Sequence, residues 1–156
     1  MKENSMEQGM GFLVKTAARW LKGFLLVFAV SLIAYGHLTH GDGFSGGIMV
    51  ACVFAAIFLV EGKAASARTL SRRAAYLIGS AATLALLLLG LLGMVRGGAF
   101  LKNFLVSLEP ARFVLISGGT IPLFNLCVGV IVGMFLFTYF TIIADYDAPK
   151  KDGEGK

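Results

Sequence analysis

Apolar residues along the chain fall into four long runs that are separated by shorter polar segments. A helix needs about 20 predominantly apolar residues to cross a bilayer, and only a helix satisfies its own backbone hydrogen bonds there. The pattern therefore predicts an all-α integral membrane protein with one domain, residues 20–144, between a tail at 1–19 and a charged tail at 145–156. The four transmembrane helices are expected at residues 20–36, 44–60, 74–95 and 121–144.

Composition agrees with this class of protein. Hydrophobic residues make up 57% of the chain and charged residues only 15%, whereas soluble domains carry about a quarter charged residues. The two cysteines, Cys52 and Cys127, both lie inside apolar runs, which favours buried thiols that pack as small hydrophobes. Cysteine and histidine do not show a zinc-site spacing, so we expect neither a metal nor another cofactor.

Lysine and arginine are distributed unevenly between the two sides of this arrangement. Eleven of the 14 lysines and arginines lie in three segments: residues 1–22, the loop 61–73 and the C-terminal tail. Because cytoplasmic segments carry an excess of these residues, both termini are predicted to be cytoplasmic, in a multi-pass protein of the cell membrane. The net charge of +5 is then a topology signal, and a nucleic-acid partner is not expected.

Charged side chains are absent from the middle of the first, third and fourth runs. Ion paths through membranes normally use such groups, so we expect no catalytic residue and no self-sufficient ion carrier. Glu61, at the end of the second run, has two interpretations. It is a carboxylate that exchanges a proton or cation, or an interfacial charge that is neutralised by Lys63 or Arg68, and the second is favoured.

Two histidines lie in the segment GHLTHGDGFSGG, residues 36–47, between the first two runs. His37 ends the first run and could receive a proton near neutral pH, but a histidine there also caps the last helical carbonyls. We favour the capping role. His40 and Asp42 lack further ligands for a metal site, so we expect them to be solvated.

The glycines of this segment indicate a structural role for it, in a turn and in close helix packing. They can adopt positive φ and so permit a tight reversal between adjacent spans, and Gly46 and Gly47 can also bring the backbone close to a neighbouring helix. The glycines concerned are Gly36, Gly41, Gly43, Gly46 and Gly47.

The segment GHLTHGDGFSGG resembles the G-H-x-x-P-G-G-G-F-x-G-G hallmark of the B subunit (MnhB-like) of Mrp-type multisubunit sodium/proton antiporters. A second segment, GGTIPLFNLCVGVIVG at 118–133, is similar to the one that opens the last helix in that family. Related subunits occur in the membrane arms of energy-converting hydrogenases and sulfane reductases. His40 stands where the hallmark has proline. Asn125 stands where many members have an aspartate, which implies the loss of a proton carrier.

The resemblance implies a small, non-catalytic subunit in a hetero-oligomer of Mrp-type membrane subunits within the lipid bilayer. Such a subunit supports assembly, and His37, Glu61 and Asn125 are the candidates for lining a path for Na⁺ or H⁺. Two alternatives stay open: the equivalent subunit of a redox-driven membrane complex, and a self-associating four-helix membrane protein.

Overall fold

The computed structural model describes residues 12–36, 38, 41–105 and 118–146, and the regular secondary structure within them is helical. Four helices are long and apolar enough to cross a membrane, which confirms the predicted all-α membrane fold. The helices are α1 (Phe12–Tyr35), α2 (Gly43–Glu61), α3 (Lys63–Thr69), α4 (Arg72–Gly97) and α5 (Ile121–Tyr146).

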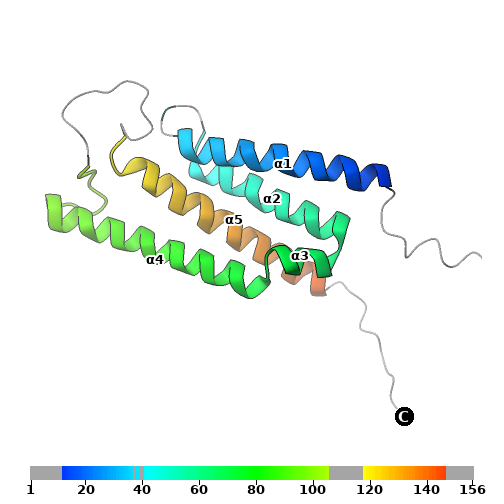
Figure 1. The fold of residues 1–156 in the computed structure, drawn as a ribbon. Helices are drawn as coiled ribbons and strands as arrows, with labels where there is room; N and C mark the ends of the chain where they lie inside the picture. Colours follow the sequence, from blue (N-terminus) through cyan, green and yellow to red (C-terminus); the bar gives the residue numbers. More distant parts are fainter. Residues whose placement is uncertain (1–11, 37, 39–40, 106–117, 147–156) are drawn as a thin grey trace, which may run out of the picture.

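The long helices follow the apolar runs closely, except at the start of α1. This helix begins at Phe12, eight residues before the expected span at residue 20, and carries Lys15 and Arg19 on its first turns. Lys22 of α1 lies beside Glu61, the last residue of α2. The polar first turns of α1 therefore extend beyond the end of α2, as Figure 1 shows.

Local sequence signals fix several helix ends. The side chain of Asp42 caps α2 by accepting a hydrogen bond from the Ser45 N–H at 2.7 Å, and Ser71 caps α4 in the same way. α4 ends at Gly97 and is capped by Gly98, whose left-handed backbone (φ 80°) suits glycine. Gly62, at φ 87°, joins α2 to α3. The short helix α3 lies in a segment that the sequence analysis treated as a loop.

The four long helices lie side by side in the order α1, α2, α5, α4 (Figure 1). α2 packs against both α1 and α5, and α4 packs against α5. The last helix in the chain therefore lies between the second and the fourth. Its C-terminal end lies at the same end of the molecule as the start of α1.

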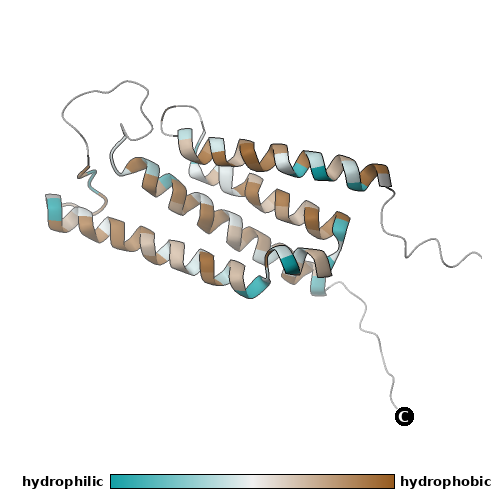
Figure 2. Ribbon diagram, viewed as in Figure 1, coloured by the Kyte–Doolittle hydropathy of each residue, from teal (hydrophilic) through white to brown (hydrophobic). Residues whose placement is uncertain are grey.

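This layer buries a narrow core and leaves broad apolar surfaces outside. Phe137 of α5 is 1% exposed, and its ring centroid lies 5.4 Å from that of Phe54 on α2. By contrast, Phe24 and Val27 on α1 are at least 70% exposed. Figure 2 shows hydrophobic colour along the helices and hydrophilic residues mainly toward their ends, which is the pattern expected for helices that are solvated by lipid.

Glycines of α4 pack in two different ways. Gly79 faces α5, where an added Cβ would lie 3.3 Å from Met134. An added Cβ on Gly90 would lie 2.6 Å from the ring of Phe100, and one on Gly93 would lie 2.8 Å from the backbone nitrogen of Lys102. The small residues near the end of α4 therefore accommodate the chain that follows this helix, rather than another helix.

Asn103 holds the start of α5. Its side-chain oxygen accepts hydrogen bonds from the Thr120 backbone N–H at 2.8 Å and from the Thr120 hydroxyl at 2.9 Å. Its side-chain nitrogen donates to the carbonyl of Gly118 at 2.8 Å. Thr120 is fully buried, so these two donors have no access to water.

We predict that Asn103→Ala lowers the free energy of unfolding by about 1–3 kcal/mol, because it leaves the buried donors of Thr120 without their acceptor. Thermal unfolding of the detergent-solubilised chain, followed by circular dichroism, measures the change. Thr120→Val is the matched comparison, since it removes the hydroxyl donor together with its need for the acceptor. In the Thr120→Val background, Asn103→Ala should cost less than in the unchanged chain; an equal cost would show that the Thr120 hydroxyl is not a group that matters.

Candidate functional site

Three of the five motif glycines, Gly43, Gly46 and Gly47, lie buried on the first turns of α2 where this helix meets α1 and α5. A Cβ on Gly43 would overlap the backbone carbonyl of Asn125 on α5, and one on Gly47 would lie 2.6 Å from the carbonyl oxygen of Gly129. These nearest atoms belong to the backbone of α5, which cannot shift as a flexible side chain can. Any larger residue at these two positions would therefore push α2 away from α5.

The facing surface of α5 is also built from glycine. A Cβ on Gly133 would lie 3.2 Å from the carbonyl oxygen of Gly47, and one on Gly129 would lie 2.7 Å from the side chain of Ile33 on α1. Gly46 in turn faces Ile33 and the carbonyl of Ala29. We call this meeting of three helices the glycine contact; it comprises Ala29, Ile33, Gly43, Gly46, Gly47, Gly129 and Gly133.

Gly36, Gly43, Gly46 and Gly47 do not have the positive φ that we expected of the motif glycines. Positive φ values are found instead at Gly62, Gly98 and Gly119. The cap by Asp42 starts α2 directly at Gly43, so the later motif glycines are helical. They are needed for the close approach of backbones, which we expected at Gly46 and Gly47 and which is observed there.

The turn before α2 contains the remaining polar candidates. Asp42 is exposed, and its pKa is lowered by hydrogen bonds from the hydroxyl and then the backbone N–H of Ser45. His37 and His40 lie outside the described residues. Gly36 is tightly enclosed, since an added Cβ would lie 2.9 Å from the carbonyl oxygen of Gly41. In the described part of the chain, His, Cys, Asp and Glu do not gather in threes as metal ligands.

Asn125 lies beside the glycine contact, because its carbonyl faces Gly43. The residue is half-buried, and its side-chain amide forms no hydrogen bond with the described residues. An amide inside a membrane domain is stabilised when it finds a polar partner. The side-chain amide of Asn125 is without such a partner in the described part of the chain.

Glu61 is paired with a different residue from the ones we expected. Its Oε1 lies 2.5 Å from Lys22 Nζ of α1, and both side chains are about one-third exposed. The interpretation that Lys63 or Arg68 neutralises it is wrong, because the packing of α1 against α2 places Lys22 beside the end of α2. Lys63 instead lies 2.7 Å from Asp145.

Asp145, near the end of α5, joins three helices and was not identified from the sequence. It forms ion pairs with Lys63 of α3 and Arg72 of α4. The only available signal was an acidic residue directly after the last apolar run. A second difference concerns the thiols: Cys52 faces outward from α2, and Cys127 is only partly buried, because a single layer leaves one face of each helix uncovered.

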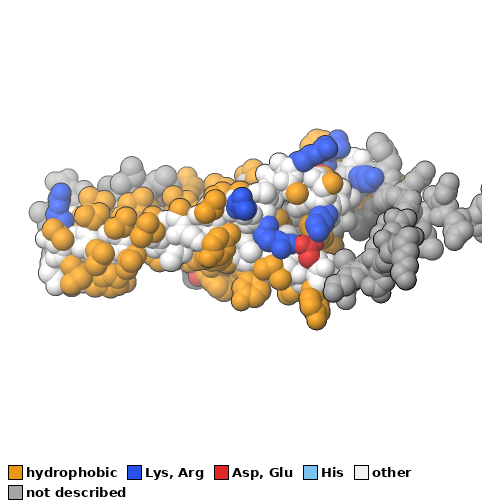
Figure 3. Space-filling view, turned by 90° about the horizontal axis from the view of Figure 1, so that it is seen from below, with side chains coloured by type: hydrophobic (Ala, Val, Ile, Leu, Met, Phe, Trp, Pro, Cys, Tyr) orange, Lys and Arg blue, Asp and Glu red, His pale blue; other side chains and the backbone are white. Residues whose placement is uncertain are grey.

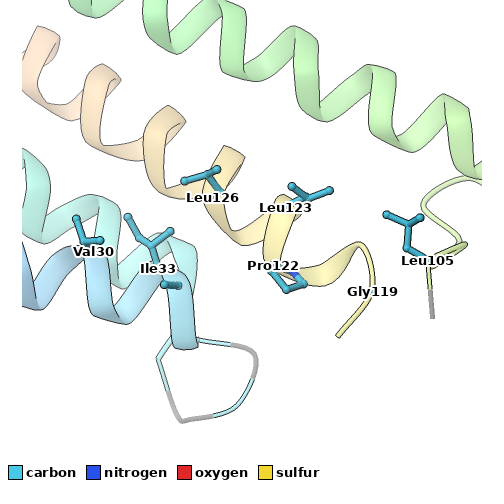
Figure 4. Close-up of a pocket in the computed structure, with 8 residues that line it drawn as sticks. Val30, Ile33, Leu105, Gly119, Pro122, Leu123 and Leu126 are labelled. Atoms are coloured by element: carbon cyan, nitrogen blue, oxygen red, sulfur yellow. The ribbon is translucent and has the colours of Figure 1, made fainter. Parts of the chain in front are cut away.

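An apolar groove runs beside the glycine contact, between α1 and the start of α5 (Figure 4). It has a volume of about 430 Å³ and carries no charged side chain. The groove is lined by Val30, Ile33, Ala34, Leu105, Gly119, Pro122, Leu123 and Leu126. Such a surface can accept lipid chains or an apolar helix, and it offers nothing for chemistry on a substrate.

We predict that Gly47→Ala and Gly43→Ala each destabilise the fold by about 1–3 kcal/mol, the usual cost of overpacking. Gly23→Ala on α1 is the matched control, since an added Cβ there meets no atom within 4 Å. Alanine also favours helix, so this control should be neutral or stabilising. Thermal unfolding in detergent measures all three variants. The glycine contact would lose its importance if Gly47→Ala behaved like Gly23→Ala.

Comparison with known proteins agrees with this arrangement. Residues 13–138 match the family described as a domain related to the MnhB subunit of Na⁺/H⁺ antiporter. A protein of Methanocaldococcus jannaschii, named only as an uncharacterized protein, is 29% identical over 121 residues. That alignment covers 75% of this chain and 46% of the relative, so the chain spans about half the length of the relative. The chain belongs to the family of domains related to the MnhB subunit of Na⁺/H⁺ antiporter.

Proposed function

We propose that this chain is a small, non-catalytic subunit of a Mrp-type cation (Na⁺)/proton antiporter module in the cell membrane. It would act in a hetero-oligomer with other Mrp-type membrane subunits, where it supports assembly. Family membership supports the link to antiport. The more specific proposal, that this subunit is non-catalytic and supports assembly, rests on where its charged side chains lie.

Charged residues of α2, α4 and α5 lie only in the first or last turn of each helix. They are Glu61 on α2, Arg72, Arg73 and Arg96 on α4, and Asp145 on α5. Proton and cation relays through membranes are built from ionisable groups within the spans. We infer that the transported ions cross through groups that other subunits supply.

The shape of the layer supports the assembly role. α1 and α4 lie at its two edges with wide apolar faces (Figure 1), and the apolar groove lies between α1 and α5. Helices in lipid associate by close packing rather than by exclusion of water. We infer that at least one of these surfaces packs against a helix of another subunit.

Both termini are proposed to be cytoplasmic, with residues 20–144 as the membrane domain and tails at 1–19 and 145–156. Two observations support this orientation. α1 starts and α5 ends at the same end of the layer, and Lys22, Lys63 and Arg72 lie at that end too. Excess lysine and arginine is typical of the cytoplasmic side.

Asn125 is the residue we propose for a polar contact with a neighbouring subunit or an ion path, because its amide is unpartnered among the described residues and lies at the glycine contact. Glu61 is proposed as an interfacial anchor between α1 and α2. His37 is proposed as the cap of the first span.

We predict that a tagged copy of the chain, purified from native membranes in mild detergent, brings large antiporter-like subunits with it. Blue-native electrophoresis followed by mass spectrometry identifies the complex and its members. A homo-oligomer of this chain alone would contradict the proposal. Co-purification with redox subunits would instead assign it to an energy-converting, hydrogenase-like complex.

We predict that Glu61→Gln leaves assembly intact, lowers the free energy of unfolding by less than about 1 kcal/mol and leaves Na⁺/H⁺ exchange unchanged, because exposed ion pairs contribute little. Exchange is measured in vesicles with a fluorescent pH probe. Lys22→Gln is the matched control, since it breaks the same ion pair but keeps the carboxylate. Loss of exchange only in Glu61→Gln, in a normally assembled complex, would make Glu61 a translocation residue.

A further inference from the structure

Basic side chains gather where α3, α4 and α5 meet. Figure 3 shows lysine and arginine side chains around an acidic group there, next to hydrophobic surface. A groove of about 650 Å³ opens at this place, and we call it the basic groove. It is lined by Lys63, Arg72, Arg73, Tyr76, Thr138, Ile142 and Asp145.

The basic groove has an excess of positive charge. Asp145 is the only acidic side chain among its lining residues, and it pairs with both Lys63 and Arg72. Arg73 forms no ion pair within the described residues. Three cations thus face one carboxylate, which leaves a net charge of about +2 by the usual protonation states.

A smaller cavity lies directly inside this groove and shares Lys63, Arg72 and Asp145 with it. Ser66 of α3 lines the inner cavity and is only 2% exposed. Its hydroxyl has no hydrogen-bond partner among the described residues, whereas the Thr141 hydroxyl donates to the carbonyl of Thr138 at 2.8 Å. A buried hydroxyl without a partner indicates that an external acceptor belongs there.

The opposite side of the basic groove is apolar and open. Tyr76 is 56% exposed and Ile142 is 48% exposed, and each lies about one turn from the charged end of its helix, α4 or α5. Along each helix a charged group is therefore followed by an aromatic or aliphatic side chain. This sequence matches the change from headgroup to acyl chain at a membrane surface.

We propose that the basic groove binds the headgroup of an anionic phospholipid. Arg73, Arg72 and Lys63 contact the phosphate, Ser66 donates its hydroxyl to a headgroup oxygen, and the acyl chains lie against Tyr76 and Ile142. Basic pockets between membrane helices at the cytoplasmic side suit such headgroups. A lipid fits better than an acidic peptide of a partner protein, because the apolar half of the groove continues onto lipid-facing surface.

Native mass spectrometry of the full chain tests this proposal, after exchange into mixed micelles with equal amounts of phosphatidylglycerol and phosphatidylcholine. We expect the chain to retain phosphatidylglycerol preferentially. Arg73→Gln should reduce that retention about five-fold, which corresponds to about 1 kcal/mol per cation. Arg96→Gln is the matched control, since Arg96 lies at the opposite end of the same helix, and it should leave retention unchanged.

Two further measurements keep the test decisive. Preferential retention should weaken when salt rises from about 50 to about 500 mM, because salt screens exposed charges. Equal retention of the two lipids, or an equal loss in Arg96→Gln, would overturn the proposal. Thermal stabilisation by inorganic phosphate as strong as by phosphatidylglycerol would show that a free anion, not a lipid, is bound. Loss of a partner subunit from the complex purified out of native membranes when the chain carries Arg73→Gln, with lipid retention by the isolated variant unchanged, would overturn the proposal and assign the groove to a protein interface.

Discussion

The approach of one helix backbone to another at the glycine contact is the constraint on which the layer depends. Gly47 of α2 faces the backbone of Gly129 on α5, and Ile33 of α1 fits against both helices. Water does not drive helices together inside lipid, so close dispersion contacts take over that role. Because the backbones of α2 and α5 lie in close contact, these two helices together form the surface on which α1 packs. α4 packs against the other side of α5.

Ion pairs join the helices at the opposite end. Lys22 of α1 pairs with Glu61 of α2, and Asp145 of α5 pairs with Lys63 of α3 and Arg72 of α4. Tight packing near one end therefore contributes most of the stability, the ion pairs at the other end add little, and the middle of α2, α4 and α5 carries no charge. A subunit built in this way is well suited to serve as a rigid neighbour for chains that conduct ions.

The four long apolar helices could be predicted from the sequence, because length and hydropathy are local properties of each run. The sequence also pointed to Gly46 and Gly47 as places of close backbone approach. It misassigned the partner of Glu61, because Lys63 and Arg68 are its neighbours in the chain, whereas Lys22 comes beside it only through the packing of α1 against α2. Asp145 was missed for the same reason: its partners come from α3 and α4, and pairing across helices has no signature in a single run.

The spatial order α1, α2, α5, α4 has a consequence for biogenesis. Helices leave the ribosome in chain order, so α4 enters the membrane before the helix against which it packs. Until α5 is inserted, α4 has no extensive contact with the pair formed by α1 and α2. Insertion of the final helix between α2 and α4 then completes the tertiary structure in one step. A chain truncated before residue 121 would therefore leave its last helix loose in the bilayer, as a natural substrate for membrane quality control.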